Sequence, residues 1–324
     1  MKRPFKSSIC CFLLLAFLQR QEAYAQSDQH YTMFMYNKLL YNPGYAGSRD
    51  VMSANAVYRD QWTGINGAPK TMNISLDGPL GNYMQSFRKV AIGVSINNEK
   101  LGVENNTSLK AYYAYRIKLS SSVVSFGLEA GADMYSANYS QTNPFQQNDP
   151  NLTNDVKNVM LPNFGAGVYW SGDNFYAGLS VPNFLQNYYD KKEVDSNTIK
   201  ARQIRTYYIC GGYVFPLNET FKLEPQVLVR YAGNATYKLP VSSDFNLSLI
   251  AYDRLMLGFT YRTDKSMEVI VHVQATKKVN IGYSYDYLMS ALNGYSKGTH
   301  EIVLGYDFIK ENSKYTTPRF IRAF

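Results

Sequence analysis

Three histidines are the side chains of this 324-residue chain that could act as a general base in catalysis. They are His30, His272 and His300, which stand far apart in sequence, with no carboxylates at the spacing of a metal site. A phospholipase built on a β-barrel could still bring a serine and a histidine together from separate strands, with His272 as the base. The chain contains no Walker loop and no H-E-x-x-H motif, and its one G-x-S-x-G run, at 294–298, lies between two predicted strands rather than at the strand-to-helix turn of a hydrolase. We therefore predict no enzymatic activity, no metal and no cofactor, and place His272 in a hydrogen-bond network.

Charged residues of both signs form the second set that could interact. They recur on one side of the predicted strands while the other side is apolar, so an enclosed interior would bring them together. Opposite charges would neutralise one another in such a lumen. The predicted lumen network consists of Arg59, Glu129, Asp133, Arg230, Glu268, His272, Asp286 and Glu301.

Alternation of apolar with polar or small residues runs through most of the chain after residue 51. The segments span about 9–12 residues, which is the length of a tilted strand that crosses a bilayer. An even number of antiparallel strands can close into a barrel, and closure leaves no unpaired edge in lipid. We place about fourteen strands at 51–60, 70–77, 88–97, 105–119, 122–136, 162–171, 174–181, 203–215, 220–231, 239–251, 253–262, 267–276, 279–288 and 299–309.

Alternation would also fit a soluble β-sandwich, so other features must choose between the two. Aromatic residues make up 15% of the chain, 29 of them tyrosines, and they lie on the apolar faces. Aromatic girdles at both interfaces are typical of membrane barrels. The polar faces combine small residues with both signs of charge, as a crowded lumen requires. We therefore predict an all-β fold, a transmembrane antiparallel barrel of the outer membrane that contacts its lipids.

The N-terminus has the organisation of a secretory signal peptide, residues 1–25. Basic residues come first, an apolar run follows at 9–18, and Ala23-Tyr24-Ala25 forms an A-x-A cleavage site. Removal leaves Cys210 alone, and a single cysteine forms no internal disulfide. Part of the net charge of +8 leaves with the signal, and the rest is spread without a basic block, which argues against nucleic-acid binding.

Residues 26–50 differ from the strand pattern that follows them. Met33, Phe34, Tyr36 and Leu40 stand at helical spacing, and Asn42-Pro43-Gly44 is a helix stop. We predict a short amphipathic helix that could plug the lumen, lie on the membrane or bind a partner, and packing into the barrel is the simplest of these. The predicted organisation is a signal at 1–25, this helix at 26–50, a barrel at 51–310 and a tail at 311–324.

Three separated stretches resemble the PorP/SprF family of Bacteroidota outer-membrane proteins. Residues 282–302 contain G-Y-S-Y-D and G-T-H-E-I, and residues 58–71 contain Y-R-D-Q-W and G-A-P-K-T. The opening motif is similar to Q-x-D-P-x-x-[ST]-x-x-M-[FY]-N followed by N-P-A-x-A-G, although Gln29 replaces its proline and Gly44 its first alanine. The positions that carry this motif, and that we consider plug and partner contacts, are Asp28, Met35, Tyr36, Asn37, Asn42, Pro43, Ala46 and Gly47.

The resemblance implies a fourteen-stranded, non-enzymatic barrel of the type IX secretion and gliding motility apparatus. It also implies partners: a secreted surface adhesin or its C-terminal domain, and periplasmic secretion-system or peptidoglycan-binding proteins. Two other functions remain open on the residues themselves. One is a channel for small solutes or hydrophobic compounds, and the other is a hydrolase at the lumen or rim. The connections at 137–161 and 182–202 are predicted to face outward, because periplasmic turns are short.

Overall fold

The computed structural model describes residues 30–82, 84, 89–142, 155–189, 202–233 and 240–309. The predicted signal peptide, Asp28 and the predicted C-terminal tail lie outside the described residues.

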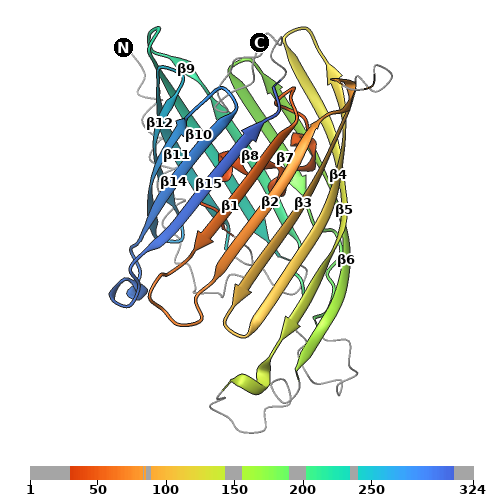
Figure 1. Ribbon diagram of the computed structural model, residues 1–324, viewed down its shortest axis with the longest axis vertical. Coiled ribbons are helices and arrows are strands. Elements are labelled where there is room, and N and C mark those ends of the chain that lie inside the picture. The colour runs from red at the N-terminus through yellow and green to blue at the C-terminus, as the bar shows by residue number, and fades with distance from the viewer. Residues whose placement is uncertain are drawn as a thin grey trace, which may run out of the picture.

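The described residues form a closed antiparallel barrel of fourteen strands (Figure 1), which confirms the predicted fold. Fifteen strands carry labels because the short β9 continues the line of β8 and pairs with β10. The strands are β1 (Ser53–Asp60), β2 (Lys70–Pro79), β3 (Val90–Leu101), β4 (Glu104–Lys118), β5 (Ser122–Ala137), β6 (Val156–Gly172), β7 (Phe175–Val181), β8 (Thr206–Tyr213), β9 (Phe215–Pro216), β10 (Phe221–Ala232), β11 (Ser242–Ala251), β12 (Leu255–Arg262), β13 (Ser266–Gln274), β14 (Val279–Leu288) and β15 (Thr299–Asp307).

The barrel closes where the first strand meets the last. β1 pairs with β15 over eight residue pairs, from Ser53 opposite Asp307 to Asp60 opposite His300. We call this pairing the seam. Every other long strand pairs with its neighbours in sequence, so the meander is unbroken and no strand edge is left to lipid at the level of the seam.

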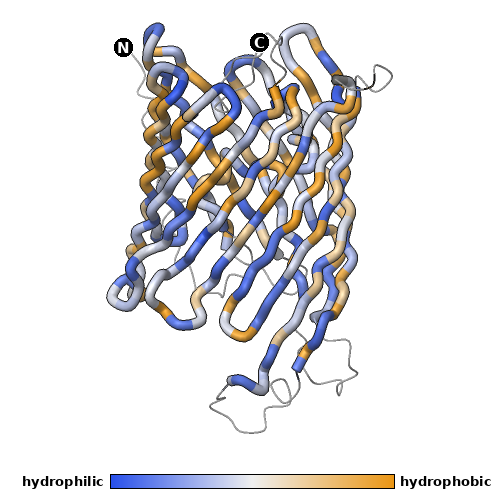
Figure 2. Tube along the Cα trace, in the orientation of Figure 1, coloured by the Kyte–Doolittle hydropathy of each residue, from blue (hydrophilic) through white to orange (hydrophobic). Residues whose placement is uncertain are grey.

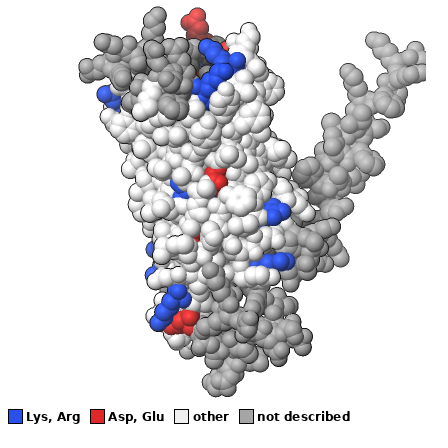
Figure 3. Space-filling view, turned by 90° about the vertical axis from the view of Figure 1, so that its right-hand side faces the viewer, with Lys and Arg blue, Asp and Glu red and all other residues white. Residues whose placement is uncertain are grey.

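Side chains alternate between the two surfaces of the wall, as a membrane barrel requires. Leu128 is 59% exposed on the outside, whereas the adjacent Glu129 is 3% exposed on the inside. Figure 2 shows the same alternation of hydrophobic and hydrophilic residues along the strands, and most of the outer wall visible in Figure 3 is uncharged. The apolar outer face belongs in hydrocarbon, because water would leave this large apolar surface unburied.

The long connections leave the barrel at one end, the lower end in Figure 1. β6 begins at Val156, six residues before the predicted start, so the β5–β6 hairpin reaches beyond the neighbouring strands at this end. The β5–β6 connection therefore runs from 138 to 155, and the β7–β8 connection from 182 to 205. By the rule that periplasmic turns are short, we expect this end to face outward, and we call it the outer end.

The N-terminal segment, residues 30–50, forms short turns instead of the single amphipathic helix expected. The turns are η1 (Phe34–Tyr36), α2 (Lys38–Tyr41) and η2 (Pro43–Tyr45). Asn37 and Asn42 separate them with non-helical backbones, Asn42 being extended with a φ of −145°, and Pro43 begins the third turn. The segment lies inside the barrel (Figure 1), so the enclosing wall fixes its shape rather than helix propensity.

Three further 3-10 turns lie in connections: η3 (Leu80–Asn82), η5 (Tyr139–Gln141) and η6 (Ala291–Gly294). Within the part of the chain that the structure describes, no helix has the length and apolar character needed to cross a membrane.

Candidate functional site in the barrel interior

The outer part of the lumen holds the start of the N-terminal segment by its backbone. The carboxylate of Glu301 accepts hydrogen bonds from the backbone N–H groups of Thr32 at 2.8 Å and of Met33 at 2.9 Å. Arg59 donates to the same carboxylate at 2.9 Å and to Asp286 at 2.7 Å. All these groups are at most 3% exposed. Charge-assisted hydrogen bonds in so dry a place fix the segment firmly to β1, β14 and β15. We call Arg59, Asp286 and Glu301 the clamp.

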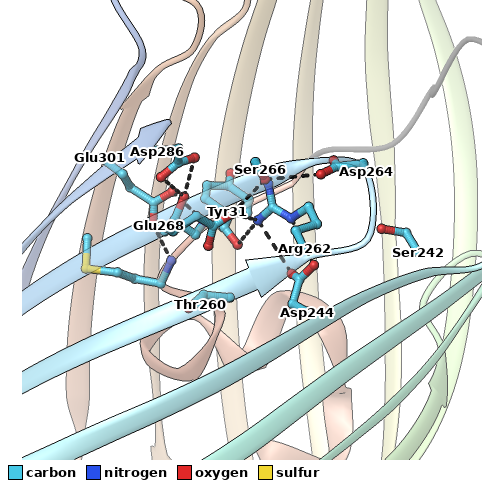
Figure 4. Close-up of polar contacts among 12 residues, drawn as sticks. Tyr31, Ser242, Asp244, Thr260, Arg262, Asp264, Ser266, Glu268, Asp286 and Glu301 are labelled. Carbon is cyan, nitrogen blue, oxygen red and sulfur yellow. Dashed lines mark hydrogen bonds and ion pairs between the residues drawn. The ribbon is translucent and has the colours of Figure 1, made fainter. Parts of the chain in front are cut away.

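A second group of charged residues lies beside the clamp (Figure 4). Arg262 donates to Asp244 at 2.9 Å and forms an ion pair with Glu268 at 2.9 Å. Arg230 forms an ion pair with the same Asp244 at 2.7 Å. Arg262 also donates to the backbone carbonyl of Tyr31, at 3.4 Å. The second group therefore contacts the same end of the N-terminal segment as the clamp does.

An apolar cluster follows along the segment. Tyr31, Met33, Phe34 and Tyr36 are each at most 5% exposed and pack against inward-facing apolar residues of the wall. We call these wall residues the apolar belt. The belt takes one residue from each of six strands: Val57, Leu228, Ile250, Met256, Ile270 and Val303. Because apolar side chains from both partners exclude water, the segment and the belt form a seal across this side of the lumen.

The motif residues Asn42, Pro43 and Gly44 reach the opposite wall. The Asn42 amide donates to the backbone carbonyl of Val168 on β6 at 3.0 Å and accepts from the Gly44 N–H at 2.9 Å. The wall has no side chains at this point, because Gly127, Gly167 and Gly178 face the segment; we call them the glycine window. A Cβ on Gly127 would lie 2.0 Å from the nitrogen of Gly44, so the close approach requires glycine there.

Charged residues also hold the C-terminal end of the segment. The Gly47 N–H donates to Asp77 of β2 at 2.8 Å, and Gly47 has a φ of +71°. Arg49 forms a 2.6 Å ion pair with Asp307 of β15, and Asp50 pairs with Arg116 of β4. The segment is therefore attached to the wall at both ends and in the middle.

Lys38 lies between these attachments, in α2. Its Nζ stands 3.5 Å from the centre of the Tyr176 ring, a cation–π contact. Burial lowers the pKa of Lys38 to about 8, and the Glu224 carboxylate acts in the opposite direction. The ammonium group is thus held against the inner face of β7.

Glu129 and Asp133 serve a separate network at the outer end. Lys110 pairs with Glu129 at 2.7 Å, and Gln203 donates to Asp133 at 2.6 Å. Gln203 belongs to the β7–β8 connection and also accepts from Asn163 of β6 at 3.3 Å. These bonds tie the described parts of that connection to the inner face of β5 and β6, next to a cluster of Tyr135, Tyr139, Val156, Leu161 and Tyr189.

His272 is fully buried and in contact with the segment. Its ring stacks on Tyr36 with 3.9 Å between the ring centres, and its Nε2 lies 3.1 Å from Oδ1 of Asn280. The Tyr36 hydroxyl lies 3.1 Å from the sulfur of Met256. The imidazole therefore packs between the barrel wall and the Tyr36 ring of the segment.

The predicted lumen residues fall into four groups. Arg59, Asp286 and Glu301 form the clamp, Arg230 and Glu268 belong to the second charge group, and His272 lies under Tyr36. Glu129 and Asp133 form a different network and do not touch the others. The motif residues Met35, Tyr36, Asn37, Asn42, Pro43, Ala46 and Gly47 are all buried in the lumen, with Ala46 packed on Leu39 and Tyr112.

Sequence reasoning missed several residues of the site. Asp77, Asp244, Arg262 and Asp307 stand at inward positions of their strands, so the alternation could have identified them. The glycine window gave a weaker signal, because a glycine at an inward strand position also suits a bulge or a bend. Among the residues that the structure describes, no group of three or more potential ligands is placed to hold a metal ion.

Solved structures with a similar overall arrangement share little sequence with the chain. One is the TodX monoaromatic hydrocarbon channel, with TM-score 0.44 and 9% identity, covering 86% of this chain and 94% of that one. Another is the NanC porin, with TM-score 0.42 and 12% identity, covering 80% of this chain and 100% of that one. Omp33 of Acinetobacter baumannii gives TM-score 0.41 and 9% identity, over 79% and 96% of the two chains.

No curated protein matches the chain. A family model does, over residues 23–306, which include the N-terminal segment and almost the whole barrel. This protein is an integral outer-membrane barrel and belongs to the family described as type IX secretion system membrane protein PorP/SprF.

Proposed function

We propose that the protein is a non-enzymatic component of the type IX secretion and gliding machinery that docks a secreted surface protein, an adhesin, at its outer end. In this proposal its other end contacts periplasmic parts of the machine, including peptidoglycan-binding proteins. Family membership implies interaction with secretion machinery and cargo in general. The observation that carries the docking function is the filled lumen: residues 31–37 are buried against the wall, which leaves the rim and loops as the working surfaces.

The long outer connections support docking at that end. The β5–β6 hairpin extends beyond its neighbours, and the β7–β8 connection is tied to its inner face through Gln203 and Asp133. Loops held on a rigid scaffold are the usual place for binding residues. The opposite end offers short turns and a strongly exposed residue, Tyr252, at 74%.

Site-specific photocrosslinking in native outer membranes tests this assignment. A crosslinking amino acid at Tyr139 should capture a secreted surface protein, and one at Tyr252 should capture a periplasmic protein. The control position is Leu128 on the lipid face, where neither should be captured. Capture of periplasmic proteins from Tyr139, or of nothing but lipid from all three positions, would contradict the proposal.

A channel for small solutes is the second candidate, and unpaired polar atoms favour it. Both polar atoms of the Asn37 side chain are buried without a hydrogen-bond partner among the described residues, as is Oγ of Ser284. Buried polar groups without protein partners commonly bind water, so parts of the lumen are expected to be hydrated. Liposome swelling in small sugars separates the candidates: the docking proposal predicts no uptake by the intact protein and uptake after deletion of 27–42.

The absence of catalysis remains part of the proposal. His272 is 0% exposed and covered by the Tyr36 ring, so a substrate could not reach its imidazole without displacing the segment. Lipase activity should be the same background value for the intact protein and for His272→Ala. Activity that is lost in this variant would establish a hydrolase instead.

A further inference from the structure

Two carboxylates on the last strand are bound by the two ends of the N-terminal segment. Glu301 and Asp307 stand six residues apart on the inward face of β15 and are at most 1% exposed. Glu301 accepts from the backbone of Thr32 and Met33, near the start of the segment. Asp307 accepts from Arg49, near its end, at 2.6 Å. The segment therefore spans the strand from one carboxylate to the other.

Each of these carboxylates also accepts a hydrogen bond from β1, across the seam. Glu301 of β15 bonds to Arg59 of β1 at 2.9 Å, and Asp307 bonds to the hydroxyl of Ser53 of β1 at 2.7 Å. Both junctions thus join three parts of the chain: the segment, the first strand and the last strand. If the segment left, Glu301 and Asp307 would each lose the donors that hold their side chains in place beside β1, at the two ends of the seam.

The middle of the segment is fixed to the far wall. Asn42 bonds to Val168, and Gly44 lies against the glycine window of β5, β6 and β7. A change at Gly127 would therefore push the segment away from the far wall while leaving every residue of the seam in place. Because Gly127 lies far from the seam, any effect of its substitution on the seam must be transmitted through the segment.

We propose that the N-terminal segment is an internal clasp that holds the first and last strands together. Insertion of residues 30–50 and stable pairing of β1 with β15 are one cooperative event, and displacement of the segment weakens the seam. This coupling is independent of the docking function, since it concerns only how the barrel closes.

A crosslink across the seam tests the clasp. Ala56 and Leu304 face each other on β1 and β15, and both point away from the lumen. Opposite residues of an antiparallel pair have Cα atoms about 4.5–5.5 Å apart, a separation that a disulfide spans. The test combines Gly127→Ala with Ala56→Cys and Leu304→Cys, in a Cys210→Ala background. The readout is the temperature at which the folded band is lost on SDS gels.

The clasp predicts that Gly127→Ala lowers this temperature and that the seam disulfide restores it, with the restoration lost on reduction. The matched control is a disulfide between Tyr113→Cys and Leu128→Cys, opposite each other on β4 and β5. This control should not restore the temperature. A seam disulfide that restores no more than the control would overturn the clasp.

A second pair of variants covers the case in which Gly127→Ala fails to assemble. Glu301→Gln removes a carboxylate that binds both the N-terminal segment and Arg59 of β1. Glu268→Gln removes an equally buried carboxylate that is paired with Arg262 and lies away from the seam. The seam disulfide should restore the folded band of Glu301→Gln and leave that of Glu268→Gln unchanged. An equal response of the two variants would overturn the clasp.

Discussion

The side chain of Asn42 donates a hydrogen bond to the backbone carbonyl of Val168 across the barrel interior, with 3.0 Å between the two atoms. This contact links a residue of the N-terminal motif to a strand more than 120 residues later in the chain. It is possible because Gly167 and Gly178 flank the carbonyl on the inner wall and leave room for the amide. The motif asparagine therefore hydrogen-bonds to the backbone of the wall rather than to a side chain.

Asn42→Ala and Gly167→Ala should interact in a double-mutant cycle. A Cβ on Gly167 would lie 2.3 Å from the Asn42 amide oxygen, so Gly167→Ala should destabilise the protein by displacing that amide. Asn42→Ala removes the amide, so the glycine change should cost less in that background. Tryptophan fluorescence in a urea titration in lipid vesicles gives the four free energies of unfolding. Strict additivity would contradict the contact. Gly211→Ala is the control, since the nearest atom to its Cβ would be 3.5 Å away.

Arg59→Met should strongly destabilise the barrel. The arginine pairs with Asp286 and Glu301, and its removal leaves two buried carboxylates facing each other. Loss of one partner from a buried ion pair costs about 3–5 kcal/mol, and the same urea titration measures it. Lys70→Met is the control, because its pair with Asp60 is 3.7 Å long and the lysine is 56% exposed. An exposed pair contributes about 0–1 kcal/mol, so equal losses in the two variants would refute the clamp.

Val269→Arg tests the lipid-facing assignment of the outer wall. Val269 lies in the middle of β13 and is 55% exposed on the apolar side. Arginine near the bilayer midplane costs about 2–4 kcal/mol in a membrane barrel and about 0–1 kcal/mol near the interfaces. Asn105→Arg, on the same face but near the outer end of β4, should therefore be almost neutral. A cost for Val269→Arg no greater than that for Asn105→Arg would place this wall outside the membrane.

The fold could be predicted from the sequence because the barrel rests on one repeated local rule. Alternation of period two assigns each strand residue to a side of the wall, and the rule holds from Ser53 to Asp307. It failed at the start of β6, where residues 156–161 do not alternate. There Asn158 has a φ of +49° and the pairing with β5 shifts register, so the strand continues without the period of two that would reveal it.

The site was less predictable because its contacts join residues that are distant in sequence, and alternation does not show which of these residues meet. Arg59, Asp286 and Glu301 could be assigned to the lumen, but their contact with the backbone of Thr32 and Met33 could not. Helical spacing at 33–40 predicted one helix, and the observed segment is bent to follow the wall. Apolar spacing cannot distinguish a helix from a chain whose apolar residues are selected by an enclosing barrel.

Single-channel conductance in planar bilayers tests the filled lumen most directly. The purified intact protein should carry no steady current, because residues 31–37 and the apolar belt seal the interior, whereas the variant lacking 27–42 should carry one. A steady open-channel current in the intact protein that is unchanged by this deletion would contradict the account.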